Sequence, residues 1–140
     1  MDYLKLDEQL CFPLYVCSKE IIKRYKPFLE QIDLTYTQYI VMMVMWEEKE
    51  IQFRELTKKL YLESNTLTPV LKKLENKQFI ERKKITGNEK NIVLSITQKG
   101  IDLKEKAKLV PKLMDKCLEI NEKDGEELKE ILERIMITFK

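Results

Sequence analysis

The period of the hydrophobic pattern constrains the fold of this chain more than any other feature. Up to Asn76, apolar residues recur every three or four positions, as they do on one face of a helix. From Phe79 to Ile96 they alternate instead, in two runs separated by the turn-like segment 86–90. After Thr97 the helical period returns. The sequence therefore predicts a mainly α-helical domain that contains one small β-hairpin.

Four helices are expected before the hairpin and two after it. The first begins near Asp7 or at Pro13, and the sequence leaves this choice open. The second begins at Thr35, and its run 39–46 is apolar on all sides, which predicts a central buried helix. Ser64 is expected to cap the fourth helix. The remaining helices are expected at 51–61, at 97–118 with Thr97 as cap, and at 121–139 with Asn121 as cap.

Composition excludes several classes of function. The chain has 140 residues and no histidine, so Ser-His-Asp and Cys-His catalysis and His-ligated zinc sites are ruled out. The three cysteines, Cys11, Cys17 and Cys117, form no Cys-x-x-Cys pair, which argues against a metal site or a disulfide framework. No apolar run approaches the roughly 20 residues of a membrane span, and no secretory signal is visible. A cytoplasmic protein without metal or cofactor is expected.

The charge of the chain is unevenly distributed. Residues 52–91 contain ten Lys and Arg against five Asp and Glu, a net charge of +5, whereas the rest of the chain carries −3. A basic segment within a nearly neutral protein is typical of a nucleic-acid binder. Lysines that only keep exposed helices soluble are the alternative interpretation.

The order of the expected helices and strands also indicates a DNA-binding protein. Three helices followed by a hairpin, at 35–97, is the order of a winged helix-turn-helix. The flanking helices, at 6–31 and 98–140, carry apolar stripes that such a small domain cannot cover. We therefore expect residues 1–140 to form one chain that pairs with a second copy through these helices.

Three sequence strings resemble the MarR family of transcription regulators. They are Leu10-Cys11-Phe12-x-Leu14-Tyr15, Leu34-Thr35-Tyr36-x-Gln38-Tyr39 and the segment 64–75. The resemblance is greatest to the thiol-based branch, which includes the organic-hydroperoxide repressors. It implies a homodimer that binds a pseudo-palindromic operator in double-stranded DNA. Each subunit would place its fourth helix in a major groove and its hairpin, the wing, in a minor groove.

The resemblance and the chemistry of the side chains together give the candidate DNA contacts. Short polar side chains at the start of the fourth helix would face base edges, and lysines further along it would contact phosphates. The family usually has Asp and Arg near the wing tip, where this chain has Asn88 and Lys90, so weaker wing contacts are expected. The full candidate set is Ser64, Asn65, Thr66, Thr68, Pro69, Lys72, Lys73, Arg82, Lys83, Lys84, Asn88 and Lys90.

Cys11 is the candidate sensor of an organic hydroperoxide. It lies near the start of the first helix, where the helix dipole favours the reactive thiolate. The resemblance implies that tyrosine hydroxyls bond to its sulfur, two of them from the other subunit, and the matching positions are Tyr15, Tyr25 and Tyr36. Cys117 matches the resolving thiol of two-cysteine relatives, although a packing role fits it equally well.

The expected function is a repressor that leaves DNA when Cys11 is oxidised. Two alternatives remain. A small phenolic ligand bound between domains could control the same DNA-binding dimer. A thiol peroxidase is the enzymatic alternative, but Cys11 has no neighbouring Thr or Arg to polarise a peroxide, and a basic hairpin would serve no purpose there.

Overall fold

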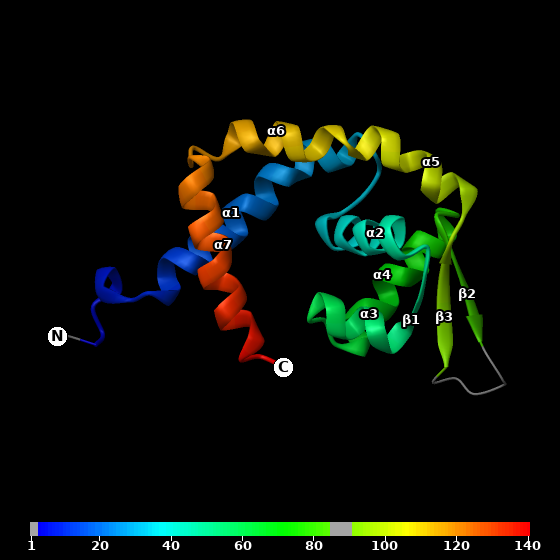
Figure 1. The fold of residues 1–140 in the computed structure, drawn as a ribbon, viewed down its shortest axis with the longest axis horizontal. Coiled ribbons are helices and arrows are strands. Elements are labelled where there is room, and N and C mark those ends of the chain that lie inside the picture. Colours follow the sequence, from blue (N-terminus) through cyan, green and yellow to red (C-terminus); the bar gives the residue numbers. More distant parts are fainter. Residues whose placement is uncertain (1–2, 85–90) are drawn as a thin grey trace.

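A computed structural model describes residues 3–84 and 91–140 of the chain (Figure 1). A short 3-10 turn, Leu6–Glu8, precedes the first helix. The helices are α1 (Cys11–Glu30), α2 (Tyr36–Glu48), α3 (Phe53–Leu60), α4 (Ser64–Asn76), α5 (Gln98–Ala107), α6 (Leu109–Cys117) and α7 (Glu122–Ile137). The strands are β1 (Glu50–Gln52), β2 (Ile80–Lys84) and β3 (Ile92–Ile96). Within these residues, no helix is both long and apolar enough to cross a membrane.

The central helix α2 forms the core, as its apolar run predicts. Thr35 begins it through a capping box with Gln38, and Met42 and Met45 are fully buried. At its far end the indole of Trp46 donates a buried hydrogen bond of 2.8 Å to the carbonyl oxygen of Gly100. This bond fixes the start of α5 against α2.

Helices α3 and α4 form the helix-turn-helix. Tyr61 takes a left-handed conformation at the turn between them, with φ of 56°. The apolar face of α4, which consists of Leu67, Leu71 and Leu74, is buried. Beside it lies an antiparallel sheet of order β1-β3-β2, in which Ile80 pairs with Ile96 and Arg82 with Leu94. The winged helix expected from the order of the elements is confirmed.

The bounds of three expected helices differ from the structure. The expected helix 51–61 begins later, because Lys49 reverses the chain with φ of 67° and residues 50–52 pair with β3. The expected helix 97–118 is two helices, since Pro111 cannot donate a hydrogen bond to the carbonyl of Ala107. Helix α1 begins at Cys11, which is neither of the two starts considered.

The expected cap of the recognition helix α4 is also wrong. Glu63 occupies the N-cap position without a side-chain hydrogen bond, and Ser64 is the first helical residue. Capping by Thr97 and Asn121 is confirmed, because their side chains accept bonds from the amides of Gly100 and Asp124.

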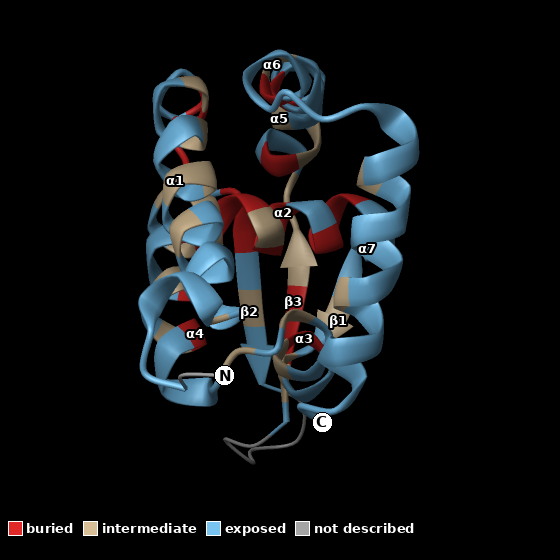
Figure 2. Cartoon of the chain, turned by 90° about the vertical axis from the view of Figure 1, so that its left-hand side faces the viewer, coloured by how far each residue is buried: buried red, intermediate tan, exposed pale blue. Residues whose placement is uncertain are grey.

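The helices at the two ends of the chain leave apolar faces uncovered. Figure 2 shows α7 as exposed along most of its length, opposite α1. Leu4 is 95% exposed and Phe139 is 70% exposed. Other large apolar side chains exposed on these two ends are Leu6, Leu10, Phe12, Tyr15, Leu128, Ile131, Ile135 and Ile137. An apolar surface of this extent is characteristic of an interface.

Replacing Gly100 by alanine should destabilise the fold. A Cβ at this position would lie 2.8 Å from Cγ1 of Ile96 and closer still to the carbonyl oxygen of Phe79. We expect Gly100→Ala to lower the free energy of unfolding by about 2 kcal/mol or more, as overpacking does. Gly125→Ala is the matched control in α7. It meets no atom within 4 Å and should stabilise by about 0.5–1 kcal/mol. Urea denaturation measures both, and equal effects would contradict this account.

Candidate functional site

The outward face of α4 presents the polar residues expected to contact DNA. Ser64, Asn65 and Thr66 are exposed in its first turn, on the side away from the buried leucines. The hydroxyl of Thr68 donates to the carbonyl oxygen of Ser64 at 2.7 Å, which leaves its oxygen as an acceptor. Pro69 is exposed one turn into the helix. This end of α4 therefore offers short hydrogen-bonding groups on a surface without long side chains.

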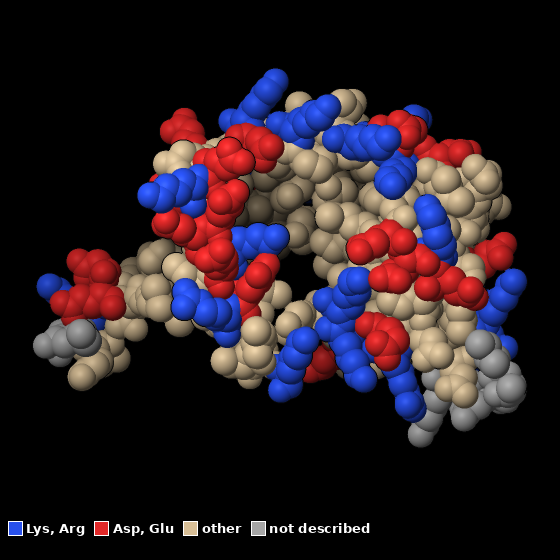
Figure 3. Space-filling view, viewed as in Figure 1, with Lys and Arg blue, Asp and Glu red and all other residues tan. Residues whose placement is uncertain are grey.

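Basic side chains flank this surface. Lys72 and Lys73 are exposed on the following turn of α4, and Lys83 and Lys84 are exposed on β2. Asn88 and Lys90 lie outside the described residues. Figure 3 shows further Lys and Arg side chains over α3 and acidic side chains crowded over α7. Basic side chains therefore lie on α3, α4 and β2, and acidic side chains predominate on α7.

Arg82 is held by a carboxylate of the recognition helix. Its Nε and Nη2 donate to the two carboxylate oxygens of Glu75 at 3.0 and 3.2 Å. The hydrogen bond from Arg82 lowers the pKa of Glu75. The pair joins the last turn of α4 to the wing strand β2. Its geometry favours a role in fixing the angle of the wing over the direct DNA contact expected from the sequence.

Cys11 is the first residue of α1, and its thiol is exposed. The preceding residue, Leu10, has no polar side chain to accept bonds from the amides of the first turn. The amides of the first turn therefore have no side-chain cap at this position. Tyr15 lies one turn further along α1 and is also exposed.

Two of the three expected tyrosines meet at the other end of α1. The rings of Tyr25 and Tyr36 lie 5.0 Å apart, and Tyr39 lies 5.8 Å from Tyr25. Burial raises the pKa of Tyr25 to about 12, with smaller contributions from Tyr36, Tyr39 and the carboxylate of Asp115 on α6. Burial also raises the pKa of Tyr36 and of Tyr39. We call Tyr25, Tyr36 and Tyr39 the tyrosine cluster.

One chain does not bring Cys11 to this cluster. Cys11 and Tyr25 are 14 residues apart on the same helix, which corresponds to about 21 Å. Cys17 lies between them on α1, and Cys117 is the last residue of α6, and both are exposed. A contact between the Cys11 thiol and the tyrosine cluster therefore requires a second copy of the chain.

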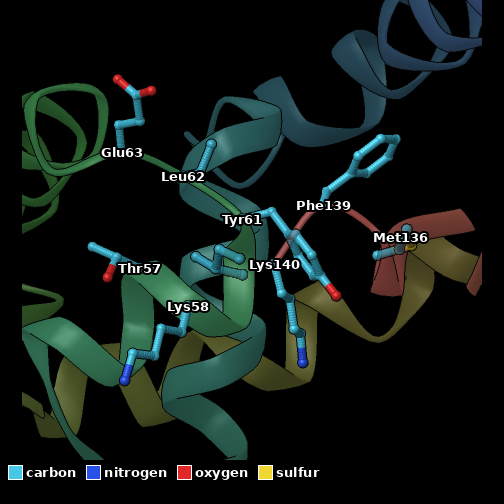
Figure 4. A pocket seen from close by; sticks show the side chains of 9 residues that line it. Thr57, Lys58, Tyr61, Leu62, Glu63, Met136, Phe139 and Lys140 are labelled. Carbon is cyan, nitrogen blue, oxygen red and sulfur yellow. The ribbon is translucent and has the colours of Figure 1, made fainter.

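A hollow of about 870 Å³ lies between the end of α3 and the end of α7 (Figure 4). Tyr61, Leu62, Met136 and Phe139 contribute apolar surface to it, and the amine of Lys140 lies 5.9 Å from the centre of the Tyr61 ring. Among the residues that the structure describes, no group of three His, Cys, Asp or Glu side chains could hold a metal ion.

Two residues of these sites were not predicted from the sequence. Tyr39 ends the second resemblance string but was not expected beside the thiol, although it comes three positions after Tyr36 on the same helix face. Glu75 ends the third resemblance string, but the sequence does not predict its pairing with Arg82. The one available indication was an acidic residue in a segment that is otherwise basic.

Known proteins share this architecture. The family model of the SarA/Rot transcriptional regulators matches residues 23–107. An organic hydroperoxide resistance transcriptional regulator of Bacillus subtilis is 39% identical over 130 residues, which cover 93% of this chain and 86% of the relative. The transcriptional regulator SarZ of Staphylococcus saprophyticus is also 39% identical, over 94% of this chain and 90% of the relative.

A solved relative has been captured in several redox states. Reduced AbfR of Staphylococcus epidermidis bound to DNA matches with a TM-score of 0.79 and 31% identity, over 95% of this chain and 91% of that chain. Disulfide-formed AbfR matches with a TM-score of 0.63 and 31% identity, over 95% and 88% of the two chains. The conformation described here is thus more similar to the reduced, DNA-bound form.

The fold and its outward helix define a winged helix-turn-helix protein of the MarR type. The chain belongs to the SarA/Rot family of transcriptional regulators. The resemblance to the thiol-based MarR branch, found from the sequence, is confirmed at the level of the family.

The tyrosine cluster should make the protein less stable at alkaline pH. A tyrosine in an unfolded chain titrates near pH 10, whereas Tyr25 in the fold titrates at about 12. Between these values the unfolded chain has lost the proton that the native chain retains, so stability falls as pH rises. We expect wild type to lose more stability than Tyr25→Phe from pH 10 to 12 in urea denaturation. Tyr3→Phe, which removes an exposed hydroxyl, is the matched control, and parallel curves for wild type and Tyr25→Phe would contradict this assignment.

Proposed function

We propose that the chain is a homodimeric, sequence-specific DNA-binding repressor that oxidation of Cys11 releases from its operator. The observation that carries this proposal is the division of the thiol site. Cys11 begins α1, whereas Tyr25 and Tyr36 lie at its far end, so only two paired chains complete the site. The names of the relatives, an organic hydroperoxide resistance regulator and a DNA-bound AbfR in reduced form, support DNA binding and a response to an organic hydroperoxide.

The exposed apolar faces of α1 and α7 form the dimer interface. Pairing through a two-fold axis presents two α4 helices to successive major grooves of the same DNA face. Ser64, Asn65, Thr66, Thr68 and Pro69 then face base edges. The contacts to phosphates come from Lys72, Lys73, Lys83 and Lys84, and in the wing from Asn88 and Lys90. Arg82 holds the wing through Glu75 and contacts no phosphate.

The salt dependence of DNA affinity distinguishes residues that contact phosphates from residues that only hold the wing. Each dimer carries two copies of Lys72, so Lys72→Ala should lower the slope of log K against log salt by about two. Arg82→Ala should weaken binding without changing the slope, and Glu75→Ala should weaken it by the same factor. Lys129→Ala, on the acidic helix α7, is the matched control and should have no effect. A slope that falls in Arg82→Ala as in Lys72→Ala would show that Arg82 contacts phosphate. Titrations of a selected DNA duplex at several salt concentrations measure the slopes.

The oxidation of Cys11 by an organic hydroperoxide needs no cofactor, because the peroxide itself is the oxidant. The Cys11 thiolate attacks one peroxide oxygen of an organic hydroperoxide, the O–O bond breaks, and the alcohol leaves after taking up a proton. The sulfur becomes a sulfenic acid, oxidised by two electrons, and the peroxide is reduced. A second thiol can then displace water to form a disulfide, for which Cys117 is the candidate. Disulfide-formed AbfR supports this last step.

Cys11→Ser should abolish the response to peroxide. Reduced wild type should release its operator after one equivalent of cumene hydroperoxide per subunit, and dithiothreitol should restore binding. Cys11→Ser should bind with unchanged affinity before and after the treatment. Cys17→Ser, another exposed thiol on the same helix, is the matched control and should respond as wild type does. If Cys11→Ser releases DNA as readily as wild type, the sensor is elsewhere. Fluorescence anisotropy of a labelled duplex provides the measurement.

The same experiment separates the alternatives. The hollow beside Tyr61 has apolar walls and two nearby amines, Lys58 and Lys140, which suit a phenolic anion. Release of DNA by salicylate without any peroxide would favour control by such a ligand. Repeated turnover of peroxide with a thiol reductant would favour an enzyme, whereas a regulator consumes one equivalent. The proposed repressor acts in the cytoplasm, where thiols are reduced at rest.

A further inference from the structure

The residue that ends the recognition helix is tied to the start of α2. Lys77 follows α4 directly, and its amide donates to the carbonyl oxygen of Lys73 at 3.0 Å. Its side-chain Nζ donates to Oε1 of Gln38 at 3.0 Å and to the carbonyl oxygen of Asp33 at 2.5 Å. The same Nζ lies 3.6 Å from Oδ1 of Asp33. One amine therefore connects α4 to the turn between α1 and α2.

Gln38 makes this connection a buried one. Its side chain is 2% exposed, and it is the one polar residue buried among those described. Oε1 of Gln38 accepts two bonds, one from the amide of Thr35 at 3.1 Å and one from Lys77. The oxygen that caps the start of α2 is thus the oxygen that holds the end of α4. Buried hydrogen bonds of this kind are directional, so a displaced acceptor must move its donor or lose it.

The opposite side of the same helical turn carries the tyrosine cluster. Tyr36 and Gln38 are two residues apart, which places them about 200° apart around α2. Tyr36 stacks against Tyr25, whereas Gln38 faces Lys77. The first turn of α2 therefore lies between the tyrosine cluster and the end of the recognition helix.

Side chains at the start of α5 form hydrogen bonds with the residues that follow α4. The Nζ of Lys99 donates to the carbonyl oxygen of Lys77 at 3.0 Å and lies 5.3 Å from the centre of the Phe79 ring. The hydroxyl of Thr97 donates to the carbonyl oxygen of Gln78 at 2.6 Å. The chain immediately after α4 is thus held by several polar contacts, whereas the start of α4 is held by the packing of Leu67.

We propose that Lys77 is the positioning residue that transmits the state of the tyrosine cluster to the recognition helix. This inference rests on the proposed function, because it requires the cluster to bind Cys11 of the partner. Loss of that contact moves the first turn of α2, and Gln38 and Asp33 move with it. Lys77 then displaces the end of α4.

The length of α4 amplifies this displacement. The helix has 13 residues and is about 20 Å long. A tilt of the helix by about 5° moves the end where Asn65 lies by about 1.7 Å relative to the end at Lys77. A hydrogen bond of ordinary length does not survive such a shift. A small change at the tyrosine cluster is therefore sufficient to disrupt contacts with base edges.

The test compares DNA affinity in two redox states. The probe is a duplex selected from a random pool by reduced wild type, and oxidation uses one equivalent of cumene hydroperoxide per subunit. The measured quantity is the ratio of the reduced to the oxidised association constant. Lys77→Met keeps the length of the side chain and removes its donors. We expect its ratio to be at least about fivefold smaller than that of wild type, within the usual range of coupling between sites.

Two further variants complete the design. Lys73→Met makes the same chemical change one turn earlier on α4. It should weaken binding in both states alike and leave the ratio unchanged. Lys77→Arg retains a cation with several donors and should restore at least part of the ratio. Circular dichroism melting and the molecular mass in solution establish that each variant is folded and paired.

The outcomes distinguish the two proposals. A wild-type ratio near one means that oxidation does not control binding, and the proposed function fails. A large wild-type ratio that Lys77→Met retains overturns the role of Lys77 alone, and rotation of the whole winged domain then carries the signal. If Lys77→Met does not fold, the same ratio is measured for Lys99→Met, which removes the hydrogen bond to the carbonyl oxygen of Lys77. A retained ratio in that variant overturns the proposal, and a reduced one supports it.

Discussion

The burial of α2 is the constraint on which the other elements depend. Its apolar surface extends around the whole helix, so α1, α3, α4, α5 and the sheet all pack against it or against its immediate neighbours. The bond from Trp46 to Gly100 sets the direction in which α5 leaves the domain. Its first turn holds the tyrosine cluster on one side and Lys77 on the other. The same helix therefore determines the fold, the sensor and the position of the recognition helix.

The proposed switch depends on what a single chain leaves incomplete. Among residues 3–84 and 91–140, no element covers the exposed apolar faces of α1 and α7, and Tyr15 is the one tyrosine within one helical turn of Cys11. Pairing of two chains would cover the apolar faces and would also bring tyrosines of the partner to Cys11. This arrangement explains how the chemistry of one sulfur could control two DNA-binding helices, because the sulfur would belong to the interface that orients them.

The elements with a clear local signal were predictable from the sequence. The period of the apolar residues identified α2 and the hairpin, and the caps at Thr35, Thr97 and Asn121 followed from side chains that bond within three residues. Contacts between distant segments left no such signal. Strand β1 forms because Ile51 pairs with Leu94, and Gln38 meets Lys77 across 39 positions. The tyrosines were found through the resemblance, whereas Tyr39 was hidden by its place in an apolar run.

The distribution of charge over the two ends of the molecule has a further consequence. Helix α7 contains six acidic and three basic residues, whereas residues 52–91 carry a net charge of +5. The field of a phosphate backbone attracts the basic segment and repels the acidic side chains of α7. Encounters with DNA then favour the basic segment, and the acidic side chains of α7 are kept away from the phosphates. Orientation of this kind acts only within a Debye length, about 8 Å at physiological salt, so it governs the final approach.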